Sequence, residues 1–237
     1  MIQFEDRRAI PTRKPRIVAK KMPSTATIAD ADFLENTAAS EGGAVSNSGV
    51  LTLAASRLDL NSGGSGGGVY NSDRATVKRC TLTRNQSRWG GAIMNSATLS
   101  LESSTLDDND ATGVPGAGGG IATSATGPAI QTDVRDSTLS NNSAERGGAI
   151  SNIGELKVFN STFSANMATA EGGGVFNRDG NSLIGAATFY GNNAPSGGGI
   201  YNIKTAANES TVTVAPLWAG IVASSFTRRP PWVGSTS

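Results

Sequence analysis

Apolar residues recur along this chain at two fixed places within a repeated unit. The first marker is an aliphatic residue that directly follows a glycine run, which in some units ends in alanine. It stands at Val45, Val69, Ile93, Ile121, Ile150, Val175 and Ile200. Asparagine follows each marker at the second position, except that Thr123 follows Ile121. Successive markers are spaced roughly 24–29 residues apart, and self-similarity at a period of this length indicates a repeat architecture.

A second apolar marker keeps the same phase, and an asparagine follows it at the third position. The marker stands at Phe33, Leu58, Leu82, Leu106, Leu139, Phe163 and Phe189. The asparagines are Asn36, Asn61, Asn85, Asn109, Asn142, Asn166 and Asn192. Both apolar markers recur in seven units at a nearly constant distance from one another. Such regularity excludes a chance pattern.

Between the markers, apolar and polar residues alternate, which is typical of strands that bury one face. In the sixth unit the expected strands are "ELKVF", "STFSA" and "GGVFN". No segment shows the 3.6-residue spacing of an amphipathic helix. A propeller blade typically needs about 40 residues, and the collagen triplet is absent. We therefore predict an all-β fold, a single right-handed parallel β-helix of about seven coils over residues 26–214, with three short strands per coil.

Stacked coils place equivalent residues on one another about 4.8 Å apart. Phe163 is then expected to pack between Leu139 and Phe189 in the interior. Each buried aliphatic side chain contributes roughly 1.5–3 kcal/mol, so stability accumulates along the stack. The stacked asparagines are expected to point inward and to hydrogen-bond from coil to coil.

The repeat motifs resemble those of a known family. "GGAV" at Gly42, "GGAI" at Gly90 and Gly147, "FSAN" at Phe163 and "FYGN" at Phe189 resemble the GGA[ILV] and FxxN tetrapeptides of polymorphic outer membrane protein repeats. More broadly they resemble bacterial right-handed β-helix surface proteins of the pectate-lyase-like superfamily. The resemblance covers about residues 28–214, with Leu for Phe in four of the seven FxxN-like motifs and GGG for GGA in four of the seven glycine motifs. It implies a surface-exposed or secreted protein, while the motifs describe the coil and not a site.

The two ends of the chain lack the repeat. Residues 1–22 hold seven Lys or Arg against two Asp or Glu, a net charge of +5, and we expect residues 1–25 to form a basic, poorly ordered arm. No secretory signal peptide is visible in this arm. Residues 215–237 are interpreted as a cap or as a frame-shifted end. We therefore expect a piece of a longer exported protein, with its location on the outer membrane surface or outside the cell inferred from the resemblance.

Composition narrows the chemistry. A net charge of +1 gives no global nucleic-acid signal, and no stretch has the length of a membrane-spanning helix. The absence of histidine removes the commonest general base and metal ligand. Cys80 occupies the column held by Ser56, Ser104, Ser137 and Ser161, so it is interpreted as a small packing residue.

Two acidic clusters lie in the long third and fourth units. Carboxylates that could bind Ca²⁺ stand at Asp107, Asp108 and Asp110. A cluster that could serve proton abstraction stands at Asp133, Arg135 and Asp136. A structural interpretation, with exposed turn aspartates and a solvated strand face, is favoured over both. Neither a cofactor nor a metal is therefore expected.

The residues directly after the first marker should face outward by alternation. Tyr70, Met94, Phe176 and Tyr201 in this column would form a contact stripe for a glycan or for a protein on a host or neighbouring cell. Scattered surface apolars under a neighbouring loop are an equal alternative. The preferred function is a non-catalytic structural or adhesin-like surface module. The alternative is a polysaccharide lyase or glycoside hydrolase of the pectate-lyase-like superfamily.

Overall fold

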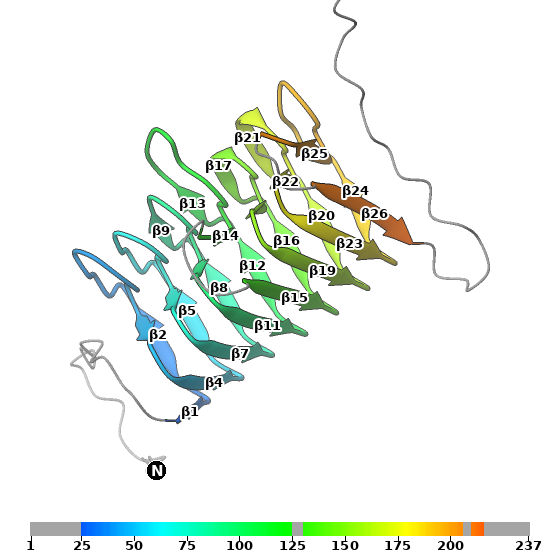
Figure 1. Cartoon of the computed structure of the whole chain (residues 1–237). Coiled ribbons are helices and arrows are strands. Elements are labelled where there is room, and N and C mark those ends of the chain that lie inside the picture. Colours follow the sequence, from blue (N-terminus) through cyan, green and yellow to red (C-terminus); the bar gives the residue numbers. More distant parts are fainter. Residues whose placement is uncertain (1–24, 125–129, 206–209, 216–237) are drawn as a thin grey trace, which may run out of the picture.

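The computed structural model describes residues 25–124, 130–205 and 210–215, which form a stack of parallel coils (Figure 1). All described regular structure is β, from β1 (Ala26–Ala29) to β26 (Thr211–Ala215). This part of the chain holds no helix that could cross a membrane. The predictions for the basic arm and the C-terminal tail lie outside the described residues, apart from Thr25 and Ala215.

Three long sheets run the length of the stack, and every strand pairs in parallel with the equivalent strand of the next coil. Sheet A contains β1, β4 (Val50–Ala54), β7 (Arg74–Lys78), β11 (Thr98–Glu102), β15 (Gln131–Arg135), β19 (Glu155–Phe159), β23 (Asn181–Gly185) and β26. Sheet B contains β2 (Asp32–Leu34), β5 (Arg57–Asp59), β8 (Thr81–Thr83), β12 (Thr105–Asp107), β16 (Thr138–Ser140), β20 (Thr162–Ser164) and β24 (Thr188–Tyr190). Sheet D contains β3 (Val45–Asn47), β6 (Val69–Asn71), β10 (Ile93–Asn95), β14 (Ile121–Thr123), β18 (Ile150–Asn152), β22 (Val175–Arg178) and β25 (Ile200–Ile203).

A fourth, shorter sheet was not predicted. Sheet C contains β9 (Gln86–Ser87), β13 (Asp110–Ala111), β17 (Ser143–Arg146) and β21 (Met167–Glu171). It lies between the second asparagine and the glycine run, where the sequence shows no alternation. The prediction of three strands per coil is therefore right for the three long sheets and incomplete at this corner.

The register keeps equivalent residues in columns, although the third and fourth units are longer. Ile93 pairs with Ile121, and Ile121 pairs with Ile150. Leu139 pairs with Phe163, whose ring stacks on that of Phe189 at 4.7 Å between centroids. Both marker columns are buried in the interior coils, which confirms the predicted inward orientation.

The second asparagine column forms a continuous ladder. Asn85 is fully buried, and its Nδ2 donates to Asn109 Oδ1 at 2.9 Å and to the Leu58 carbonyl at 3.0 Å. The Asn85 backbone N–H donates to the same Asn109 Oδ1 at 3.0 Å. This pattern repeats at each coil, so the asparagines satisfy backbone groups that the bend would otherwise leave unpaired.

The two paired glycines are required for different reasons, the first by the turn of its own coil and the second by how closely the next coil approaches. Gly90 has a φ of 67°, and a Cβ there would lie 2.0 Å from the Ile93 carbonyl oxygen. At Gly91 a Cβ would lie 2.3 Å from the Gly119 carbonyl oxygen of the next coil. The third position of the run instead accepts alanine, as at the buried Ala92. This difference explains why both GGA and GGG occur among the units.

Candidate functional site

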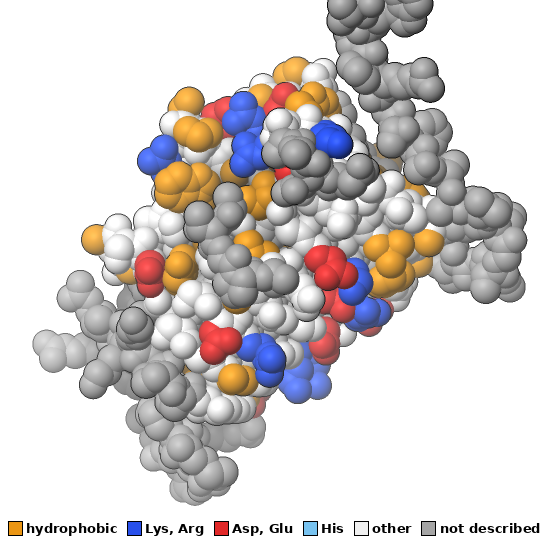
Figure 2. Space-filling model, in the orientation of Figure 1, with side chains coloured by type: hydrophobic (Ala, Val, Ile, Leu, Met, Phe, Trp, Pro, Cys, Tyr) orange, Lys and Arg blue, Asp and Glu red, His pale blue; other side chains and the backbone are white. Residues whose placement is uncertain are grey.

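The outer face of sheet A carries charged side chains on β11, β15 and β19. Strand alternation turns Leu101, Val134 and Val158 inward, so their neighbours point to solvent. Figure 2 shows acidic and basic side chains interspersed on this side of the solenoid. A shallow depression of about 190 Å³ crosses β11, β15 and β19 and is lined by Thr98, Leu99, Ser100, Gln131, Thr132, Asp133, Glu155 and Lys157. We refer to it as the sheet A trough.

Asp133 is the one residue lining this trough that has a shielded, unpartnered polar atom. Its Oδ2 accepts from Arg135 Nε at 3.0 Å and Nη2 at 2.9 Å. Its Oδ1 is hidden from solvent and has no hydrogen-bond donor among the described residues. A carboxylate oxygen in this state is under-satisfied, so a donor that reaches it after a rotation of the side chain would be favoured.

Lys157 lies beside Asp133 in the sheet register but forms its ion pair with Glu155, at 2.6 Å. Asp133 and Arg135 likewise pair within one strand. Two ion pairs therefore lie on neighbouring strands, each formed between alternate residues on the same face of a strand, and only Arg135 of the four residues is outside the trough lining. Such half-exposed pairs contribute little stability, roughly 0–1 kcal/mol each.

The predicted cluster of Asp133, Arg135 and Asp136 is only partly brought together. Asp133 and Arg135 share the outer face of β15. Asp136 begins the following turn with a φ of 51°, and its Oδ1 accepts from Asn160 Nδ2 at 2.6 Å. The carboxylates of Asp133 and Asp136 therefore have separate partners.

The aspartates of the "LDDND" segment also have separate surroundings. Asp107 Oδ1 accepts from Ser140 Oγ at 2.6 Å and from Asn141 Nδ2 at 2.8 Å. Asp110 Oδ1 accepts from Ser143 Oγ at 2.6 Å, while Asp108 is exposed at a turn with a φ of 54°. Within residues 25–124, 130–205 and 210–215, no group of three or more acidic or cysteine side chains is placed to hold a metal ion.

The proposed contact stripe is divided into two parts. Tyr70 and Met94 are register neighbours on the outer face of sheet D, and both are half-buried. Two coils with buried small residues, Ala122 and Ser151, separate them from Phe176. Phe176 is only 4 % exposed and stacks on Tyr201 with centroids 5.9 Å apart. The ring of Phe176 is thus covered, contrary to the expected open stripe, and Tyr70, Met94 and Tyr201 keep partial exposure.

One charged cluster was not predicted from the sequence. Asp59 lies on the outer face of sheet B with its side chain 5 % exposed, and it pairs with Arg57 and Arg84, each at 2.6 Å. Burial would raise the pKa of Asp59, but the hydrogen bonds from Arg84 and Thr83 and the charges of both arginines outweigh it, so the pKa is lowered. The repeat in the sequence could have indicated this cluster. It places the strand of Asp59 beside the equivalent strand of the next coil, and Arg84 directly follows that strand.

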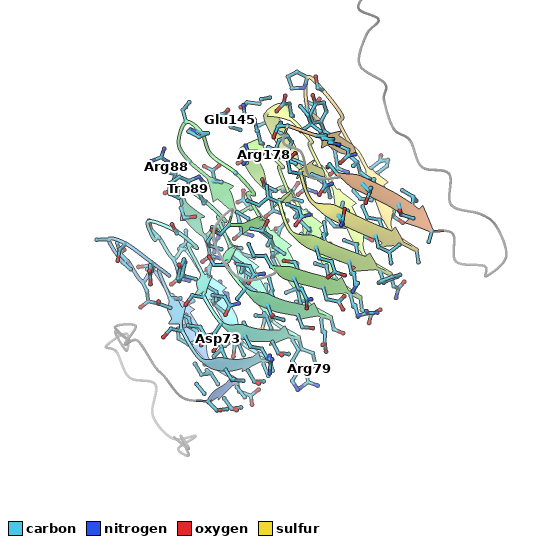
Figure 3. The ribbon with its side chains drawn as sticks, in the orientation of Figure 1. Asp73, Arg79, Arg88, Trp89, Glu145 and Arg178 are labelled. Atoms are coloured by element: carbon cyan, nitrogen blue, oxygen red, sulfur yellow. The ribbon has the colours of Figure 1, made fainter. Side chains whose placement is uncertain are left out.

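A second cluster lies at the sheet C corner. Figure 3 shows Arg88, Trp89 and Glu145 at this corner, on the far side of the solenoid from Arg79. The Arg88 guanidinium lies 4.3 Å from the Trp89 ring centroid. Arg146 pairs with Glu145 at 3.2 Å and, across one coil, with Glu171 at 2.9 Å. The pairing of Arg146 with Glu171 ties neighbouring coils together, while the contact of Arg88 with Trp89 is a cation–π interaction within one coil.

Parallel coils with inward ladders of apolar residues and asparagines define the protein as a parallel β-solenoid. The chain belongs to the right-handed β-helix family, because the family described as "Right handed beta helix region" matches residues 19–209. No curated protein and no solved structure matches the chain. The family membership agrees with the predicted fold and handedness.

Proposed function

We propose that this β-helix is a non-catalytic structural or adhesin-like module that is displayed on a bacterial cell surface or secreted. In this proposal it is a piece of a larger exported protein, and it contacts a glycan or a protein on a host or neighbouring cell. The observation that carries the proposal is the sheet A trough, where Asp133 Oδ1 lacks a donor among the described residues in a shallow depression lined mainly by polar residues.

The chemistry of the trough suits a ligand rich in hydroxyl groups. Thr98 and Ser100 offer hydroxyls, Gln131 an amide, and Asp133 and Glu155 carboxylates. Sugar hydroxyls donate and accept hydrogen bonds, so they match such a mixed set. Once a rotation of the side chain exposes Asp133 Oδ1, a ligand donor would form a charge-assisted hydrogen bond with it, which is stronger than a neutral one.

The repeat motifs support the surface location. The GGA[ILV]-like and FxxN-like tetrapeptides resemble those of polymorphic outer membrane protein repeats, whose members are surface-exposed or secreted. The resemblance concerns the coil, so it supports the location and the display role more than any particular ligand.

Binding to a panel of immobilised neutral and acidic polysaccharides tests the proposal. Asp133→Asn should weaken binding about tenfold, because it removes the charge from the acceptor. The matched control is Asp136→Asn, in the turn that follows the same strand, because its side chain faces Asn160 and not the trough. Unchanged binding by Asp133→Asn, or an equal loss in both variants, would exclude the trough as the contact site.

The alternative is a polysaccharide lyase or glycoside hydrolase, and the pairing of Asp133 with Arg135 beside the trough is the observation that favours it. Incubation with polyuronates and neutral glycans, with and without Ca²⁺, would reveal it. New ultraviolet absorbance from unsaturated ends would indicate a lyase, and new reducing ends alone would indicate a hydrolase. Either product, lost in Asp133→Asn, would replace the display role with catalysis.

A further inference from the structure

Strand β7 presents two cations on the outer face of sheet A. Ala75 and Val77 of this strand are buried. Alternation therefore turns Arg74, Thr76 and Lys78 toward solvent, where Arg74 is exposed and Lys78 is half-buried. Within the described part of the chain, neither of these two cationic side chains forms an ion pair or a hydrogen bond. Both charges are therefore free to meet a ligand.

Strand β7 lies directly beside the sheet A trough. Its register with β11 pairs Arg74 with Thr98 and Thr76 with Ser100, and both β11 residues line the trough. Ser100 pairs in turn with Asp133 on β15. Thr76, Ser100 and Asp133 thus form one row along the solenoid, with about 4.8 Å between neighbours. A ligand bound at Asp133 and extended along this row reaches β7 after two coils.

The charges of the trough itself cancel. The carboxylate of Asp133 is paired with Arg135, and the ammonium group of Lys157 is paired with Glu155. A charged ligand therefore gains little net attraction from these four side chains, and the unpaired charges on the border of the trough decide which ligand charge is favoured.

On the β7 border the cations outnumber the acids. Arg79 follows Lys78, is exposed, and likewise forms no ion pair within the described residues. The acids beside these cations are Asp73, which is exposed, and Glu102, the register neighbour of Lys78. Glu102 Oε1 accepts from Ser100 Oγ at 2.8 Å. The free charge next to the trough is thus positive.

We propose that sheet A binds a polyanionic glycan, with sugar hydroxyls in the trough and sulfate or carboxylate groups on Arg74 and Lys78. This inference rests on the proposed function and specifies the class of its ligand. The guanidinium of Arg74 can hold such a group through two parallel hydrogen bonds, while Lys78 acts as a point charge. The two residues are four positions apart on one strand face, about 13 Å, so each meets a separate anionic group. Between them Thr76 offers a hydroxyl to the sugar.

Binding to dextran sulfate, polygalacturonate and uncharged dextran at several salt concentrations tests the proposal. Both acidic glycans should bind at least about tenfold more tightly than dextran, and their affinity should fall as the ionic strength rises. The tighter of the two identifies sulfate or carboxylate as the preferred group.

Variants locate the contact on β7. Arg74→Gln should weaken binding of both acidic glycans about tenfold at low salt, and Lys78→Gln should act in the same direction. The matched control is Arg88→Gln, which removes the same charge at the sheet C corner, where Figure 3 shows Arg88 on the far side of the solenoid from Arg79. Because Arg74 acts through its charge, its effect should fade at high salt. Circular dichroism checks that each variant keeps its strands.

The outcomes separate this inference from the proposed function. Equal affinity for dextran and the acidic glycans, or equal losses in Arg74→Gln and Arg88→Gln, would overturn the inference. If Asp133→Asn alone weakened binding, and did so at every salt concentration, the trough would remain a contact site without the polyanion. Binding that Arg74→Gln weakens and Asp133→Asn leaves unchanged would reject the trough and keep the β7 contact. The absence of binding to all three glycans would reject both.

Discussion

Arg84 reaches back across one coil and donates to both carboxylate oxygens of Asp59, from Nε at 3.0 Å and from Nη2 at 2.6 Å. The two residues lie in successive units of the chain and become neighbours only because the coils stack. Arg57 adds a second guanidinium at 2.6 Å. The buried charge of Asp59 is thus balanced by two arginines, each about half exposed.

We predict that Asp59 makes the protein acid-sensitive. Because its folded pKa is lowered below the usual 3.8, its stabilising contribution is present above that value and is lost as the pH falls through the folded pKa. Asp59→Asn should cost about 1–3 kcal/mol at neutral pH, toward the lower end because the arginines reach solvent. The difference from the unmodified protein should shrink in acid. Urea unfolding between neutral pH and pH 3 measures this, with the exposed Asp108→Asn as control. A loss that stays constant with pH would contradict the assignment.

The interior column predicts a much larger effect. Ile150 is fully buried between Ile121 and Val175, and Ile150→Asp would place an unpaired charge there. We expect this variant to lose cooperative unfolding. Asp107→Asn retains an amide oxygen for Ser140 and Asn141 and should change stability by less than about 0.5 kcal/mol. Thermal melts of the two variants provide the measurement, and similar melting temperatures would contradict the inward orientation of Ile150.

The columns of the fold could be predicted because stacking repeats the same physical requirement in every coil. Residues equivalent to Leu82 and Asn85 recur once in every unit at a nearly constant spacing, and a single sequence is enough to show this spacing. Sheet C could not be predicted, since its strands are held by backbone pairing with no apolar alternation. Phe176 is buried and stacks on Tyr201, an outcome that alternation does not predict.

The trough was predicted only in part for a similar reason. Asp133 and Arg135 stand out in the sequence because they interrupt the repeat. Their neighbours on β11 and β19 come from the preceding and the following coil, and a contact of that kind requires the register. The separation of Asp136 follows from its left-handed turn conformation, which the sequence did not reveal.

Glycine positions within one run should differ sharply in tolerance. Gly90→Ala would force a side chain into a φ of 67° and against the Ile93 carbonyl, so we expect a loss of about 2 kcal/mol or more. Gly199→Ala, at the third position of the last run, would meet no described atom closer than 3.9 Å. It should be neutral or stabilising by up to about 1 kcal/mol. Chemical denaturation compares the pair, and equal losses would show that the left-handed φ and tight turn at Gly90 carry no special cost.

The asparagine ladder should be the most demanding polar feature of the interior. Asn109 is fully buried, and its side chain accepts two bonds from Asn85 and donates to the Leu82 carbonyl and to Asn142 Oδ1. Asn109→Ala leaves these groups unpaired, so we expect a loss of about 3 kcal/mol or more.

The replacement Asn109→Asp separates hydrogen bonding from shape. A carboxylate can still accept from Asn85, but it would face two acceptors, the Leu82 carbonyl and Asn142 Oδ1, and its burial would raise its pKa. Its raised folded pKa means that protonation restores a donor, so the deficit relative to the unmodified protein should shrink as the pH falls. Asn160→Ala is the control, because Asn160 is exposed and its side chain donates to the equally exposed Asp136. Urea unfolding at neutral pH and at pH 4 measures the stability of each variant. If Asn109→Ala and Asn160→Ala lost equal stability, the ladder would contribute no more than a surface contact.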